Sequence, residues 1–140
     1  MSRWINVQML QSRPGDLGQD ENRRIMFGFN IMIRKVPSEE LEQEVATVLI
    51  GAGLGDVGVG VFVSSMGHIP VGAGPYVSIQ ATGGGPGIRT QEVPGIAYEQ
   101  ATVTVIARAE TFVAASGAAW AAFNALAVVQ NTAVAAAPLA

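Results

Sequence analysis

Two segments near the start of the chain have the hydrophobic patterns of β-strands. Residues 4–11 alternate apolar and polar side chains, which is the period of a strand with one buried face. Residues 25–33 are almost continuously apolar, with Asn30 as the one polar side chain. The pattern therefore predicts a β-hairpin within residues 1–36, with a long connection between its two strands.

Two helices are predicted further along the chain. The first begins near Ser38, a favourable N-cap, and ends at the glycines that follow Ile50. The second covers residues 111–130 and has an apolar stripe, which we expect to face the core, opposite a face of small residues. The stripe consists of Phe112, Val113, Trp120, Phe123 and Leu126. The small face consists of Ala115, Ala118, Ala121, Ala122 and Ala125.

Three further strands complete the expected fold. They cover residues 61–63, 76–81 and 98–108, and a flexible glycine-rich loop over residues 83–95 connects the last two. The sequence thus predicts one α+β domain over residues 1–140, with a mostly antiparallel sheet of about five strands and two helices packed on one face. After the hairpin, residues 37–131 form a helix-strands-helix unit, and we expect residues 132–140 to be a flexible tail.

Charge is concentrated in the connection of the predicted hairpin. Only 14% of the chain is charged, yet residues 13–24 hold six charged side chains. We therefore expect this loop to contact another molecule, together with charges near the glycine-rich loop. The charged contact candidates are Arg13, Asp16, Asp20, Glu21, Arg23 and Arg24 in the first loop, and Arg89 and Glu92 in the second.

The small face of the second helix is a second candidate contact. A solvated helix face normally carries charges, and residues 111–140 have none. The alternative explanation is that alanine is simply a strong helix former. We expect Ala118 and Ala122 to lie at a contact between subunits. The uncharged stretch is long enough to span a membrane, but alanine adds little insertion energy, so we expect a soluble, buried helix.

Composition argues against several classes of function. Cysteine is absent, which removes disulfides, thiolate metal sites and cysteine nucleophiles. The net charge of −3 argues against a nucleic-acid-binding protein, because phosphate contacts need a basic patch. The first residues do not have the pattern of a signal peptide.

Four fragments that look like motifs are better explained as structural features. Residues 53–58 match G-x-G-x-x-G, but a helix precedes them and a strand follows, the reverse of a dinucleotide site. Residues 83–87 lack the end of a P-loop, and the serines and histidine of residues 64–68 lack a nucleophile elbow. The acids of residues 16–21 do not fit an EF-hand. We expect no catalytic residue, no cofactor and no bound metal.

Two blocks of the chain resemble the small tail terminator and minor capsid proteins of long-tailed bacteriophages. Residues 95–109, followed by the alanine-rich helix, are similar to the strand of that family that ends in Arg-Ala and enters its second helix. Residues 10–24 and the strand Phe27-Gly28-Phe29-Asn30 are similar to its Asp-Glu-Asn-Arg hairpin. In the family that hairpin comes last. Here it comes first, so the chain resembles a circularly permuted member whose usual start lies near Pro37.

The resemblance implies a structural protein of the virion that is not an enzyme and is made in the host cytoplasm. Members of the family form homo-oligomeric rings, usually hexamers, at the tail end or head-tail joint. The expected partners are other copies of the chain, the tail tube protein and the head connector or neck protein. DNA would pass through the lumen without specific binding, and no membrane is involved. The alternatives are a neck or tail-tube ring protein, a small-ligand or peptide-binding α+β module, and an enzyme that uses two carboxylates.

Overall fold

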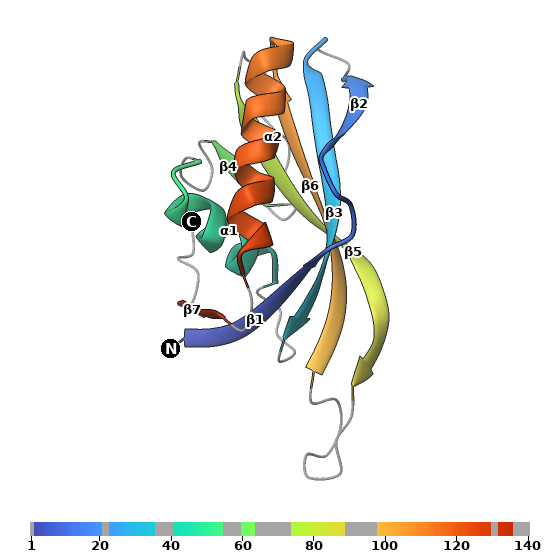
Figure 1. Ribbon diagram of the computed structural model, residues 1–140, viewed down its shortest axis with the longest axis vertical. Helices are drawn as coiled ribbons and strands as arrows, with labels where there is room; N and C mark the ends of the chain where they lie inside the picture. Colours follow the sequence, from blue (N-terminus) through green and yellow to red (C-terminus); the bar gives the residue numbers. More distant parts are fainter. Residues whose placement is uncertain are drawn as a thin grey trace.

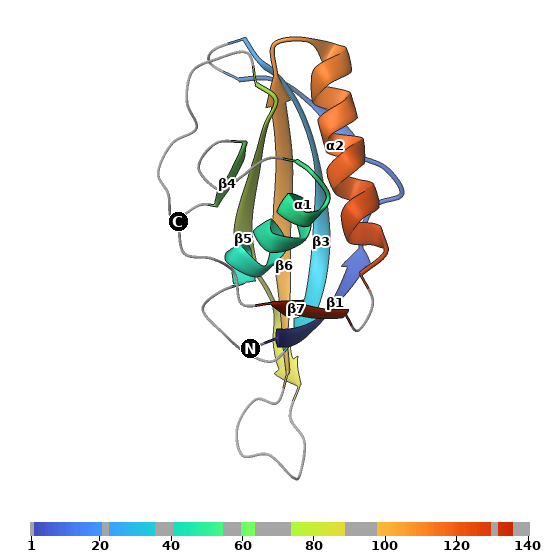
Figure 2. The same ribbon diagram turned by 90° about the vertical axis from the view of Figure 1, so that its left-hand side faces the viewer.

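Seven strands form one mixed sheet, and both helices lie against the same face of it (Figures 1 and 2). The order along the sheet is β4-β5-β6-β3-β1-β7, and β2 also pairs with β3. The computed structural model describes residues 2–20, 23–35, 41–54, 60–63, 74–88, 98–129 and 132–135. The strands are β1 (Ser2–Met9), β2 (Gly15–Gln19), β3 (Ile25–Lys35), β4 (Val61–Val63), β5 (Tyr76–Ile88), β6 (Tyr98–Ala109) and β7 (Thr132–Ala135). The helices are α1 (Leu41–Gly51) and α2 (Phe112–Ala127).

The predicted fold class is confirmed, and the sheet is larger than expected. All the strand pairs are antiparallel except β4 and β5, which run parallel. The predicted hairpin is present, because β1 pairs with the second half of β3 from Met9 opposite Ile31 to Ile5 opposite Lys35. Its connection contains β2, which pairs with the first half of β3 and was not predicted. Four of the five residues of β2 are exposed, so the sequence has no alternating pattern there.

Two segments that were predicted to be irregular are strands. The glycine-rich loop was expected to begin at Gly83, but β5 continues to Ile88, which pairs with Tyr98. Backbone pairing with the long strand β6 needs no side chains, so hydrophobic periodicity does not reveal it. The predicted flexible tail is wrong for Thr132–Ala135, which pair with β1 as β7. Residues 89–95 and 136–140 lie outside the described part of the chain.

The core lies between the sheet and the two helices. β3 and β6 form its centre and pair along eleven positions, from Ile25 opposite Ala109 to Lys35 opposite Glu99. Alternate residues of both strands point toward the helices and are buried, as period-two patterning predicts. These residues include Phe29, Ile31 and Ile33 of β3 and Ala101, Val103, Val105 and Ala107 of β6. The other face of these strands carries Asn30, Thr102, Thr104 and Arg108.

Helix α1 packs and ends as predicted. Leu41, Val45 and Leu49 are buried against the sheet. The helix ends in a Schellman motif, in which the Leu54 N–H donates to the Leu49 carbonyl (3.2 Å) and the Gly53 N–H donates to the Ile50 carbonyl (3.0 Å). Gly53 has a φ of 87°, which a glycine adopts without strain. This C-cap explains the first half of the G-x-G-x-x-G match. The predicted N-cap at Ser38 lies outside the described residues.

The orientation of helix α2 differs from the prediction. The helix begins after Thr111, whose side chain accepts a hydrogen bond from the Ala114 N–H. The buried residues are Ala115, Ala118, Ala119, Ala122, Phe123 and Leu126. Phe123 and Leu126 are therefore buried as predicted, but three alanines of the predicted small face pack on the sheet with them. Large residues such as Phe29 and Val105 already fill the sheet face, and alanines let the helix backbone approach it closely. Phe112, Val113 and Trp120, which were expected in the core, are exposed instead.

Candidate functional site

The charged connection of the hairpin is organised around Asp20. The Asp20 N–H donates to the Arg24 carbonyl (2.9 Å), and the Arg23 N–H donates to the Asp20 carbonyl (3.0 Å). The carboxylate also accepts a hydrogen bond from the Arg24 N–H through Oδ1 (2.9 Å). Arg23 has a left-handed backbone, with a φ of 61°. Asp20 thus fixes the turn between β2 and β3.

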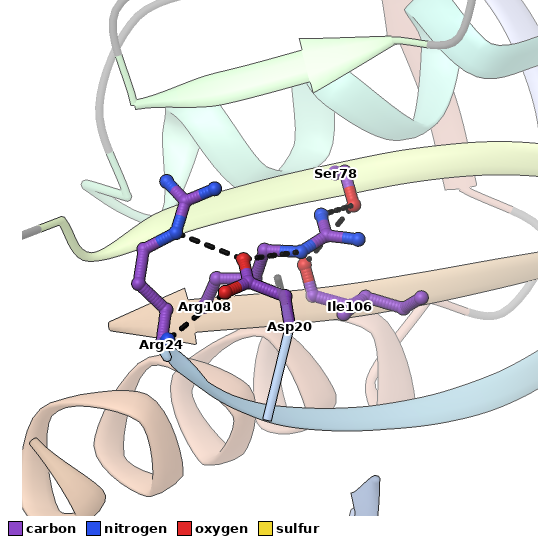
Figure 3. A network of polar contacts seen from close by, with 5 residues as sticks. All are labelled: Asp20, Arg24, Ser78, Ile106 and Arg108. Carbon is purple, nitrogen blue, oxygen red and sulfur yellow. Dashed lines mark hydrogen bonds and ion pairs between the residues drawn. The ribbon is translucent and has the colours of Figure 1, made fainter. Parts of the chain in front are cut away.

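The same carboxylate ties this turn to the middle of the sheet (Figure 3). Asp20 Oδ2 lies 2.9 Å from Arg24 Nε and 3.7 Å from Arg108 Nε. On β5, the Ser78 hydroxyl accepts a hydrogen bond from Arg108 Nη1 (3.1 Å) and donates one to the Ile106 carbonyl (3.3 Å). The network links the connection between β2 and β3 to β6 and β5, on the face of the sheet that the helices leave uncovered.

Burial sets the electrostatics of this network. The exposed fractions of the side chains are 7% for Arg24, 11% for Asp20 and 20% for Arg108. Burial lowers the pKa of Arg108, and the charge of Arg24 lowers it further, while Asp20 opposes the shift. The Arg24 guanidinium also lies 5.6 Å from the centre of the Tyr76 ring. Asp20 and Arg24, which were predicted to contact a partner, therefore have a role within the protein.

The other predicted contact residues of this segment are exposed. Asp16 Oδ1 accepts a hydrogen bond from the Gly18 N–H (2.8 Å), which supports the irregular register of β2. The Arg13 guanidinium lies 5.9 Å from the centre of the Trp120 ring, so it covers part of helix α2. Arg23 is exposed at the turn. Glu21, Arg89 and Glu92 lie outside the described residues.

The predicted contact through Ala118 and Ala122 is wrong. Ala118 is 8% exposed and Ala122 is fully buried, and both belong to the core between α2 and the sheet. They cannot meet another subunit while the protein is folded. The sequence correctly indicated an unusual helix with no charged face. It could not show which side of that helix packs inward.

The outward side of helix α2 is the most distinctive surface of the described chain. Val113 is 80% exposed, Val128 is 78% and Phe112 is 56%. Trp120 is 36% exposed and packs edge to face on Phe123, with ring centres 5.5 Å apart. No residue from 111 to 129 is charged. We call this surface the outer α2 face, and it comprises Phe112, Val113, Gly117, Trp120, Ala121, Asn124 and Val128.

The described residues offer binding surfaces more clearly than reaction chemistry. The carboxylate of Asp20 is held between two arginines, and that of Glu44 lies 3.2 Å from Lys35 Nζ. Within this part of the chain, no group of three or more His, Asp or Glu side chains could hold a metal ion. Neither helix there is both long and apolar enough to cross a membrane. Ser64, Ser65 and His68 lie outside the described residues.

Comparisons with known proteins give no match. No protein-family model matches the chain, and neither a curated protein nor a solved structure does.

Proposed function

We propose that this chain is a structural protein that assembles with copies of itself into a ring at the tail end or head-tail joint of a bacteriophage. The observation that carries the proposal is the outer α2 face, which exposes Val113, Trp120 and Val128 and has no charge. The proposal extends to the tail tube protein and the head connector or neck protein as partners in the virion. The acidic balance of the chain suits a lumen that lets DNA pass without holding it.

Covering an apolar helix face of this kind with another protein surface is favourable, because it removes apolar side chains from water. Contiguous exposed apolar patches on soluble proteins mark interaction sites, and charged residues are depleted at the centre of interfaces. Tryptophan and arginine are the residue types that contribute most binding energy there. Trp120 lies near the middle of the face, and Arg13 lies against its ring. A ring needs a heterologous contact that closes on itself, so this face would meet a different surface of the next copy.

The relative position of the two chain ends supports the resemblance to a permuted family member. β1 and β7 pair antiparallel, with Ser2 opposite Ala135 and Ile5 opposite Thr132. Residues 136–140 and Met1 would bridge these strands in a closed chain. This connection is slightly longer than the roughly two to five residues of most β-hairpin loops, and it could still join two paired strands. An unpermuted member of the family would have these elements in the chain order α2, β7, β1, β3. That chain order is compatible with the observed sheet, because β7, β1 and β3 are neighbours in it.

Light scattering coupled to size exclusion, with negative-stain microscopy of the same fractions, tests the proposal. We expect a ring of a defined number of copies. The double variant Val113→Glu/Val128→Glu should dissociate it while leaving the far-UV circular dichroism unchanged, because it places charge on the proposed interface. Gln80→Glu adds a charge to an exposed position of β5 and should leave the ring intact. A wild-type protein that stays monomeric at all concentrations would contradict the proposal.

A further inference from the structure

Arg23 has a backbone conformation that other residue types adopt more easily than arginine. Its φ of 61° lies in the left-handed region, where a side chain crowds the backbone and glycine or asparagine is preferred. Short hairpin loops that need one left-handed residue commonly place glycine there. When a large charged residue has a strained backbone conformation, a function of its side chain can explain why it is there.

Within the described part of the chain, Arg23 is held through its backbone. The Arg23 N–H donates to the Asp20 carbonyl, and any residue except proline could make that bond. Among the described residues, the ion pairs of this turn belong to Arg24 and Arg108, which hold Asp20 between them. The Arg23 side chain is exposed and takes part in none of these contacts.

The backbone next to Arg23 is anchored through its neighbour Arg24. Asp20 binds the Arg24 backbone and side chain, and Arg108 connects the carboxylate to Ser78 on β5. A guanidinium on a fixed turn loses less conformational freedom on binding than one on a loose loop. The network in Figure 3 therefore holds Arg24 and Arg108, whereas the Arg23 side chain is exposed.

We infer that Arg23 is a recognition residue whose guanidinium binds a carboxylate of a neighbouring copy of this chain, an inference that rests on the proposed function. Arginine pairs well with carboxylates, and a copy of this chain offers 11 acidic residues against 8 basic ones. A DNA backbone is the less suitable partner, because holding it takes several phosphate contacts. A ring requires a heterologous contact, so this carboxylate lies on a different surface of the neighbouring copy.

The test separates stability from assembly by replacing Arg23 with residues that suit its backbone. We expect Arg23→Gly and Arg23→Asn to weaken association between copies by about tenfold, measured by analytical ultracentrifugation. The same changes on the Val113→Glu/Val128→Glu background, where copies stay apart, should leave the melting temperature unchanged or raise it by about 2 °C. Arg23→Lys should retain part of the association. Arg34→Gln removes an exposed arginine from β3 and should leave association unchanged.

The outcomes distinguish this inference from the proposed function. A ring that forms equally well with Arg23→Gly overturns the role of Arg23 and leaves the ring proposal standing. A monomeric wild-type protein overturns both. If Arg23→Gly instead abolishes an electrophoretic shift of duplex DNA and leaves association intact, the partner is nucleic acid, and the inference of a carboxylate partner is wrong.

Discussion

Lys35 and Glu44 form an ion pair inside the core. Lys35 Nζ lies 3.2 Å from Glu44 Oε1, and the two side chains are 0% and 1% exposed. Lys35 is the last residue of β3, and Glu44 lies on the buried side of α1. The pair therefore joins the end of the central strand to the helix that follows it in sequence, and it sets where α1 can lie on the sheet.

Removing one partner of this pair should destabilise the protein strongly. Lys35→Met leaves the Glu44 carboxylate in the core without its lysine, and such losses lower the free energy of unfolding by about 3–5 kcal/mol. The double variant Lys35→Met/Glu44→Leu replaces both charges by apolar groups and should recover most of that loss. Urea denaturation followed by circular dichroism measures both values. A double variant no more stable than Lys35→Met would mean that the charges have a further structural role.

Replacing Asp20 should loosen the turn between β2 and β3. Asp20→Asn removes the negative charge between Arg24 and Arg108, and we expect a loss of about 2 kcal/mol in unfolding free energy. Asp16→Asn is the matched control, since Asp16 is exposed and its side chain bonds only to the Gly18 N–H among described contacts. That variant should change stability by less than about 0.5 kcal/mol. Equal effects of the two changes would show that the network contributes little.

Enlarging two neighbouring alanines of α2 should have different effects on stability. Ala122 is fully buried against the sheet, so Ala122→Leu overpacks the core and should lower the unfolding free energy by about 1–3 kcal/mol. Ala121 is exposed, so Ala121→Leu should leave the stability of the dissociated protein nearly unchanged. Thermal unfolding of both variants on the Val113→Glu/Val128→Glu background provides the comparison. A tolerated leucine at position 122 would contradict the packing of α2 described here.

The pairing of β1 with β7 predicts that the chain can be permuted. Joining Ala140 to Met1 and opening the chain between Val36 and Pro37 gives the element order of the resembled family. We expect this permutant to fold with the same circular dichroism spectrum and a melting temperature within about 5 °C of the parent, because β7 and β1 already lie side by side. A permutant opened within β3, between Ile31 and Met32, is the control and should not fold. Failure of the first permutant would count against the resemblance.

Much of the sheet could be predicted from local patterns. The alternating pattern of β6 places Val103 and Val105 on the covered face and Thr102 and Thr104 on the open one. β2 was missed because an exposed edge strand shows no alternation, and β7 because four residues are too few for a pattern. The ion pair of Lys35 and Glu44 was missed as well, since charged residues are rarely expected in a core.

The sequence by itself determined which residues share a strand or helix face, because those faces follow from the periods of 2 and 3.6 residues. It also determined that helix α2 has no charged side. Only the tertiary structure decided that Ala118 and Ala122 face inward and that Val113 and Trp120 face outward. The same holds for Asp20, Arg24 and Arg108, which the pairing of β3 with β6 brings together. The physical reason is that the side chains on a helix and on the sheet together set how closely the two can pack. The side of the helix that fits best therefore depends on strand residues that are far away in the sequence.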